Sequence, residues 1–260
     1  RHTRYIGDWS SDVCSSDLEE YWWSASRAAA QLLPATAQLP EAVPEAFRLL
    51  RPQVHHGWEM PLLAAVIAGY GQPVAAFQSD YAAALAASQQ QLGWLEAQLT
   101  EALDAVRQQA IASDRQAWLA LHRPYPWMLK CLQRLEAEGL PWGVLTTKSA
   151  GFTAELLRSH QLHPQAIYGR EDGPKPEVLQ RLLTHDADSG PWHFLEDRRL
   201  TLEAVRAVPA LNRVHCLLVS WGYLRPGDDR DLPAGIKLLE PEILSSPLAQ
   251  WPEAAIVQAN

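Results

Sequence analysis

Residues 142–148 read Trp-Gly-Val-Leu-Thr-Thr-Lys, a short apolar run that ends in two hydroxyl side chains and a lysine. A brief apolar run bounded by polar residues is typical of a strand buried on both faces of a sheet. The pattern recurs at 166–168, 192–197 and 214–220, and helix-forming segments alternate with these runs at 127–138, 152–161, 176–184 and 201–208. Strands that alternate with helices indicate βαβ units. We therefore predict an α/β fold with a doubly wound, Rossmann-like parallel sheet.

The part of the chain before this alternation has a different composition. Between residues 19 and 121 it is rich in Ala, Leu, Gln and Trp, and proline residues divide it into several helix-forming segments. We therefore predict three parts: a short segment at 1–18, an all-helical domain at 19–121, and an α/β core at 122–260.

Composition and charge narrow the classes of partner. The chain has 260 residues, of which 47% are hydrophobic, which is enough for a sizeable core. Its formal net charge of -8 disfavours nucleic acids and anionic membranes, since both attract basic surfaces. The most apolar stretch, 61–76, is shorter than the ~20 residues of a membrane span. Because the three cysteines are far apart and no signal peptide is visible, we expect a cytoplasmic protein without a disulfide framework or a zinc site; the oligomeric state stays open.

Polar side chains follow three of the expected strands. Thr146, Thr147 and Lys148 follow the first, Lys175 stands between two prolines after the second, and Glu196-Asp197 end the third. The carboxyl ends of parallel strands share one edge of a sheet, so we expect these groups to lie close together. Hydroxyl groups and a lysine suit a phosphoryl group, and adjacent carboxylates suit Mg²⁺.

Each of these groups also has a purely structural interpretation. The hydroxyl side chains of Thr146, Thr147 and Ser149 are able to cap the following helix. Lys175 is able to lie in an exposed turn. The two carboxylates are followed by two arginines, so they are able to form a solvated cluster of ion pairs.

The order and spacing of these groups resemble a known family. Thr146-Thr-Lys, Gly173-Pro-Lys175-Pro and Phe-Leu-Glu196-Asp197 resemble three successive motifs of the haloacid dehalogenase-like (HAD) hydrolases. The chain is most similar to their phosphoglycolate phosphatase-like group, which has a helical cap inserted after the first motif. The resemblance implies Mg²⁺-dependent hydrolysis of a small phosphorylated metabolite through an aspartyl-phosphate intermediate.

The resemblance also implies roles for the core residues. Thr146 would bind the transferred phosphoryl group, and Lys175 would stabilise charge on the nucleophile and the phosphate. Asp197, together with Glu196, would hold Mg²⁺ directly or through water. The Gly-containing segment 220–223 follows the last strong strand, near where the family has its site, and we assign it no role.

The remaining candidates would help to bind the substrate. Thr147 and Lys148 would shape the substrate entrance. His56 belongs to the most polar and aromatic cluster of the helical region, and a cap residue of this kind would help to select the substrate. The structural alternative for His56 is a surface turn beside a packed Trp58.

The chain departs from the family pattern in three places. The family's first motif, Asp-x-Asp-Gly at the end of the first strand, is absent from 4–18, where no apolar strand precedes an aspartate and Ser-Ser-Asp occurs twice. Thr201 stands where a further aspartate is common, and Glu177 where a second proline is common. We predict that residues 1–18 are not native, since they resemble a translated adapter fragment, and that the true motif has been overwritten.

Two other functions remain open. A HAD-like protein without a nucleophile would be a catalytically inactive binding or regulatory protein. A phosphomutase would share the same core motifs.

Overall fold

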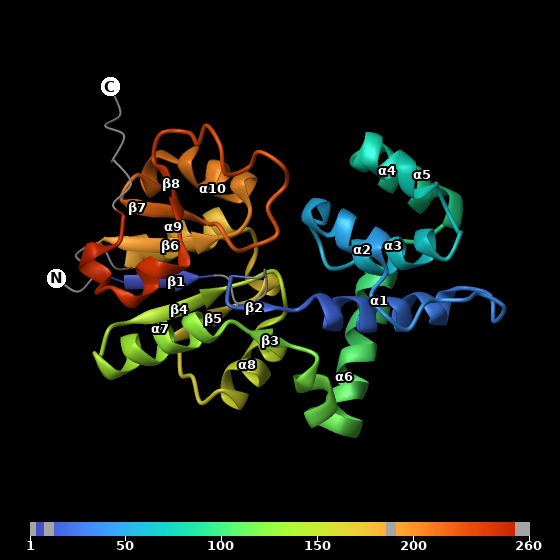
Figure 1. Cartoon of the computed structure of the whole chain (residues 1–260), viewed down its shortest axis with the longest axis horizontal. Helices are drawn as coiled ribbons and strands as arrows, with labels where there is room; N and C mark the ends of the chain where they lie inside the picture. The colour runs from blue at the N-terminus through green and yellow to red at the C-terminus, as the bar shows by residue number, and fades with distance from the viewer. Residues whose placement is uncertain (1–3, 8–12, 186–190, 253–260) are drawn as a thin grey trace. The chain divides into compact units, whose positions relative to one another are not determined.

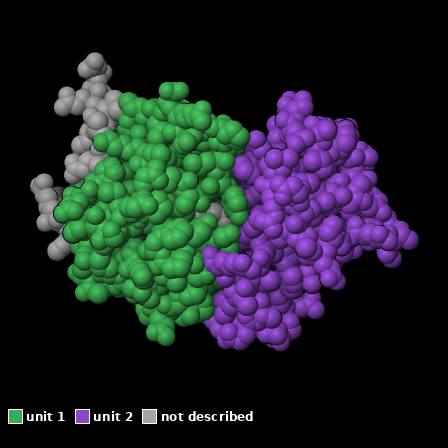
Figure 2. Space-filling model, viewed as in Figure 1, with its two compact units in different colours: residues 1–16, 124–260 green, residues 17–123 purple. Residues whose placement is uncertain are grey.

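The computed structural model describes residues 4–7, 13–185 and 191–252. The chain divides into two compact units, one made of Arg1–Ser16 and Pro124–Asn260 and the other of Asp17–Arg123 (Figure 2). It passes between the units twice, at β2 (Ser15–Ser16) and β3 (Arg123–Pro124), which pair as a two-stranded sheet.

A parallel sheet forms the centre of the first unit. Its strand order is β5-β4-β1-β6-β7-β8 (Figure 1). The first strand lies inside the sheet, and the chain adds β4 and β5 on one side before it adds β6, β7 and β8 on the other. This order confirms the predicted doubly wound α/β fold. The strands are β1 (Arg4–Gly7), β4 (Trp142–Leu145), β5 (Ala166–Tyr168), β6 (Trp192–Glu196), β7 (Val214–Val219) and β8 (Ile236–Leu239).

The start of the chain forms a strand, although it has no apolar run before an aspartate. Arg4–Gly7 is β1, and Figure 1 shows it between β4 and β6. Its Tyr5 is in register with Trp142 on one side and with His193 on the other. Without β1, the facing edges of β4 and β6 would leave buried backbone N–H and C=O groups unpaired, which is unfavourable. The four-residue strand therefore forms through pairing on both edges.

Helices alternate with these strands, and two of them pack together beside β6, β7 and β8. α9 lies against α10, and α10 contacts β6, β7 and β8. Their apolar side chains, including Val178, Leu202 and Val205, join Phe194 and Leu218 in one fully buried core. The helices of this unit are α7 (Pro126–Ala137), α8 (Ala150–Ser159), α9 (Lys175–His185) and α10 (Arg199–Arg206), with the 3-10 helices η2 (Arg170–Asp172), η3 (Pro209–Leu211), η4 (Pro241–Ser245) and η5 (Leu248–Gln250).

The second unit is helical. α1 packs against both α3 and α6, and the small buried residues Ala25, Ala28 and Ala29 allow close contact along α1. The helices are α1 (Leu18–Leu32), α2 (Glu45–Leu50), η1 (Arg51–Gln53), α3 (Glu59–Ile67), α4 (Val74–Ser79), α5 (Tyr81–Leu92) and α6 (Glu96–Ala120). Among the described residues, no helix is both long and apolar enough to cross a bilayer.

A buried ion pair joins α1 to α6 in this unit. Arg107 donates from Nε and Nη2 to the two oxygens of Glu20, over 2.7 and 2.8 Å, and the Ser24 hydroxyl also donates to Glu20. Burial is the largest single influence on the pKa of Arg107 and would lower it, but the Glu20 carboxylate, together with Tyr21 and Asp104, outweighs burial and raises that pKa. The pair therefore stays charged inside the helical unit.

Candidate active site

Three of the predicted site residues, Thr146, Glu196 and Asp197, lie at or just beyond the carboxyl ends of β4 and β6, the two strands that flank β1. Thr146 directly follows β4, Glu196 is the last residue of β6, and Asp197 comes next. Lys175 is the first residue of α9. The structure brings Lys175 and Glu196 into direct contact, with Nζ 2.6 Å from Oε2.

The Lys175–Glu196 pair is almost fully buried. The side chains of Lys175 and Glu196 are 8% and 0% exposed. The other oxygen of Glu196, Oε1, accepts a hydrogen bond of 3.1 Å from the backbone N–H of Arg198. Both oxygens of Glu196 therefore have donors. Because Lys175 is buried and begins a helix, the alternative of an exposed turn lysine is wrong.

Asp197 lies beside a loop that leaves no space for a side chain. Its carboxylate is buried, and Oδ2 accepts a hydrogen bond of 3.3 Å from the backbone N–H of Tyr223. A Cβ at Gly222 would lie 2.2 Å from the Cβ of Asp197, so only glycine permits this approach. Arg199 pairs instead with Glu203, over 2.7 Å. The alternative of a solvated cluster at the two carboxylates is therefore wrong.

The three residues after β4 have different environments. Thr146 is buried, donates its backbone N–H to the Tyr168 carbonyl over 2.8 Å, and accepts the N–H of Lys148 at Oγ1 over 3.2 Å. Thr147 is exposed and Lys148 is buried. The helix cap of α8 is Ser149, whose Oγ accepts the N–H of Phe152 over 3.4 Å. The capping interpretation is thus right for Ser149, and it does not account for Thr146.

The loop between β5 and Lys175 is held by hydrogen bonds and by close packing. The N–H of Gly169 donates to Asp172 over 2.8 Å, and Glu171 accepts the N–H of Ala150, at the start of α8, over 2.9 Å. A Cβ at Gly169 would lie 2.4 Å from the Ala150 nitrogen, so this contact also requires glycine. Gly173, two residues before Lys175, has a φ of 98°, a backbone conformation that favours glycine. The loops after β4 and β5 are therefore tied together.

Hydrogen bonds to backbone carbonyls hold Val13 and Cys14, which follow β1 in the chain. The first motif is expected near residues 5–18, and residues 8–12 of this stretch lie outside the described residues. The carbonyl of Val13 accepts the indole N–H of Trp221 over 2.8 Å, and the carbonyl of Cys14 accepts the N–H of Tyr125 over 2.9 Å. Sequence reasoning assigned no role to Trp221 or its neighbours. The available signal was a glycine between two aromatic residues, directly after a strand.

His56 belongs to the helical unit, in an exposed turn. Its backbone N–H donates to Oε1 of the buried Glu59 over 2.7 Å. Its ring is parallel to that of Trp58, with an interplanar angle of 7° and 6.4 Å between the ring centroids. The contact of His56 with a substrate stays a prediction.

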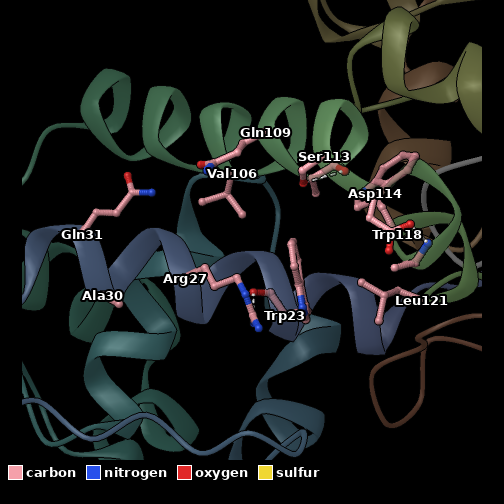
Figure 3. Close-up of a pocket in the computed structure, with 12 residues that line it drawn as sticks. Trp23, Arg27, Ala30, Gln31, Val106, Gln109, Ser113, Asp114, Trp118 and Leu121 are labelled. Carbon is pink, nitrogen blue, oxygen red and sulfur yellow. Dashed lines mark hydrogen bonds between the residues drawn. The ribbon is translucent and has the colours of Figure 1, made fainter.

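A cavity of about 520 Å³ also lies in the helical unit, between α1 and α6 (Figure 3). Trp23 and Arg27 line one wall, and the Arg27 guanidinium lies 4.1 Å from the centre of the Trp23 ring. Burial lowers the pKa of Arg27, and Glu41 partly opposes this. The opposite wall includes Asp114, where α6 bends at φ -151° and ψ 80°. The cavity shares none of its residues with the predicted site.

Few side chains at the strand ends are suited to bind a metal ion, which limits the kind of metal site that is possible there. Within residues 4–7, 13–185 and 191–252, no group of three His, Cys, Asp or Glu side chains is arranged to hold a metal ion. Mg²⁺ needs fewer protein ligands, because it commonly keeps several waters and binds through one or two carboxylates and a substrate phosphate. The buried Asp197 carboxylate at a strand end fits this requirement.

Comparison with solved structures identifies the fold. No family model matches the chain, and no curated protein matches it. A structure described as a predicted phosphatase from Clostridium acetobutylicum is 14% identical, with a TM-score of 0.59 over 94% of this chain and 96% of that one. One described as a predicted phosphoglycolate phosphatase from Haemophilus somnus is 14% identical, with a TM-score of 0.58 over 93% and 95%. A HAD-superfamily hydrolase, subfamily IA, from Geobacter sulfurreducens is 17% identical, with a TM-score of 0.54 over 94% and 95%.

These similarities extend over nearly the whole of each chain. The protein therefore has the fold of the HAD-like hydrolases, the family that its motifs resemble.

Proposed function

We propose that the native protein is a Mg²⁺-dependent phosphate-monoester hydrolase that acts on a small phosphorylated metabolite through an aspartyl-phosphate intermediate. The helical unit is its cap, and the sheet unit is its catalytic core. The observation that carries the proposal is the buried Lys175–Glu196 pair, beside Asp197 and opposite Thr146 across β1.

In this proposal, Thr146 and Lys175 bind the phosphoryl group. The Oγ1 of Thr146 already accepts the Lys148 N–H, so its hydroxyl hydrogen is directed to another acceptor, which we assign as a phosphoryl oxygen. The ammonium group of Lys175 stabilises charge that develops on the phosphate and on the attacking carboxylate. Glu196 holds Lys175 in place, because one lysine hydrogen is bound to Oε2.

Asp197 is the residue that we assign to Mg²⁺. Both oxygens of Glu196 already have protein donors, which supports a role for Glu196 in positioning Lys175 and leaves the direct metal contact to Asp197. When bound, Mg²⁺ would supply positive charge that neutralises the phosphate oxygens. The Tyr223 N–H orients the Asp197 carboxylate through its Oδ2.

Substrate selection is assigned to Thr147, Lys148 and His56. Thr147 is exposed just beyond Thr146 and is suited to contact the part of the substrate that leaves. Lys148 adds a second buried cation at the end of β4. His56 is assigned to the cap side of substrate binding, with Trp58 as its stacked neighbour.

The alternative function is favoured by one observation. The Asp-x-Asp-Gly motif is absent from the first 18 residues, so this chain lacks the expected nucleophile and the expected acid/base. A protein with Thr146, Lys175 and Asp197 but without a nucleophile would bind phosphate and not hydrolyse its esters.

The test compares two chains with the same core. We expect the chain with the present first 18 residues to bind inorganic phosphate without turnover of p-nitrophenyl phosphate. A chain whose start is replaced by the sequence read from genomic DNA, if that contains Asp-x-Asp-Gly, is expected to show Mg²⁺-dependent turnover. Lys175→Ala should abolish that turnover, whereas Lys237→Ala, at an exposed position on β8, should not. Genomic confirmation of the present codons would favour the binding protein, and turnover that survives Lys175→Ala would overturn the site assignment.

A further inference from the structure

One short turn contacts two parts of the candidate site. It consists of residues 220–223 and directly follows β7; we call it the 220–223 turn. Trp221 donates its indole N–H to the Val13 carbonyl over 2.8 Å, and the Tyr223 N–H donates to Oδ2 of Asp197 over 3.3 Å. Between these two donors, Gly222 lies against the Asp197 side chain.

The turn is itself fixed at both ends. The Ser220 N–H donates to the Leu239 carbonyl of β8 over 3.0 Å, and its hydroxyl group donates to Glu240. The Leu224 N–H donates back to the Gly222 carbonyl over 2.9 Å. Because Trp221 and Tyr223 are separated by one residue in a turn held in this way, a shift of one displaces the other.

We infer that the 220–223 turn is a positioning element that holds the Asp197 carboxylate and the backbone after the first strand in a fixed relation. The inference rests on the proposed function, which places Asp197 in the site. Trp221, Gly222 and Tyr223 act as positioning residues through Val13 and Asp197. On the Val13 side the turn contacts a backbone carbonyl, so this contact does not depend on which side chain stands at position 13.

Cys14 provides a readout of the segment after β1. Its side chain is buried next to Val13, so release of this segment would expose the thiol to an alkylating reagent. Cys131 and Cys216 serve as internal controls in the same molecule. Burial raises the pKa of Cys131 to about 12 and that of Cys216 to about 11, so both react slowly while the fold is intact.

The experiment uses the full chain and two variants of the turn. Trp221→Phe keeps an aromatic ring and removes the indole donor, and Gly222→Ala places a methyl group against Asp197. We measure alkylation of each cysteine by iodoacetamide, assigned by peptide mass spectrometry, and Mg²⁺ affinity by calorimetry. Trp251→Phe is the matched control, since it also removes an indole donor to a backbone carbonyl, that of Ser246, elsewhere in the same unit.

If the turn couples the two parts, each turn variant changes both readouts. We expect Cys14 to react about tenfold faster and Mg²⁺ to bind about tenfold more weakly, the usual loss when a partner that orients a metal ligand is removed. The control should change neither readout.

Two results would overturn the inference. In the first, Trp221→Phe affects only Cys14 and Gly222→Ala affects only Mg²⁺, so that the two contacts are independent. In the second, all three cysteines accelerate equally, so that the turn has only a general structural role. If the parent chain binds no Mg²⁺, the metal assignment of the proposed function fails, and the response of Cys14 to Gly222→Ala still decides whether the turn couples the two parts.

Discussion

The Nζ atom of Lys175 lies 2.6 Å from Oε2 of Glu196, and both side chains are withdrawn from solvent. A buried pair of this kind contributes little net stability, since the loss of hydration opposes the attraction. Loss of one partner is different, because it leaves the other charge buried without compensation. This asymmetry decides how variants at the site must be interpreted.

Lys175→Ala should therefore destabilise the protein as well as remove its activity. We expect a loss of about 3–5 kcal/mol in the free energy of unfolding, because Glu196 loses its compensating cation. The double variant Lys175→Met with Glu196→Gln removes both charges and should recover most of that loss while it stays inactive. Urea unfolding measures the stability, and equal losses in the single and double variants would contradict the account of the pair.

Asp197→Asn should separate metal binding from folding. The amide oxygen of asparagine is still able to accept the Tyr223 N–H, so the turn and the fold should persist, with a change in unfolding free energy below about 1 kcal/mol. Mg²⁺-dependent turnover of the chain with a restored first motif should fall at least about 100-fold. Asp229→Asn, at an exposed position, is the control. Retained turnover would remove Asp197 from the site.

Gly169→Ala should destabilise the loop before Lys175. The added methyl group would lie 2.4 Å from both the Ala150 nitrogen and the Glu171 carboxylate, so backbone must move. We expect a loss of about 1–3 kcal/mol in unfolding free energy, the usual range for overpacking. Gly151→Ala, in α8 with open space around it, should instead stabilise by about 0.5–1 kcal/mol. Both variants make the same substitution, so a similar effect at the two positions would contradict the required contact at Gly169.

His160 should contribute a decrease in stability at acid pH. Burial lowers its pKa from the ordinary value of 6.5, so the unfolded chain binds this proton more readily than the folded one. Stability should therefore fall as the pH drops through about 6.5, by less than about 1 kcal/mol because the ring is partly hydrated. His160→Gln should reduce the difference in unfolding free energy between pH 8 and pH 5. His163→Gln, with an exposed ring, is the control, and an equal response of both variants would exclude the burial of His160 as the cause.

The parts of the fold that the sequence predicted are those with a strong local pattern. The apolar runs ending at Leu145, Glu196 and Val219 are strands in the structure, because a strand buried on both faces needs a continuous apolar run. The four residues of β1 carry no such pattern. Their strand depends on pairing with β4 and β6, which lie far away in the chain, and local reasoning does not detect that pairing.

In the candidate site, too, sequence patterns predicted some features, whereas contacts between distant parts of the chain were missed. The sequence placed Thr146 and Asp197 just beyond the carboxyl ends of β4 and β6, as they are in the structure, since parallel strands fix where those ends lie. Their joint role in one site stays a prediction. The contact between Lys175 and Glu196 was not predicted, because each had been given a separate role. The bond from Trp221 to Val13 spans 208 positions and reaches a backbone carbonyl, which no side-chain pattern reveals.

Because β1 lies in the middle of the sheet, the two units are able to fold only in a certain order during translation. β1 emerges before its partners, because β4 begins only at residue 142 and β6 only at residue 192. The helical unit is one contiguous segment, so all of its internal contacts are available once residue 123 has emerged. Closing the long loop between β1 and β4 carries an entropic cost that only the assembled sheet offsets. The nascent chain is therefore able to fold its helical unit before its sheet is complete, since β1 pairs on both edges only after β4 and β6 have been made.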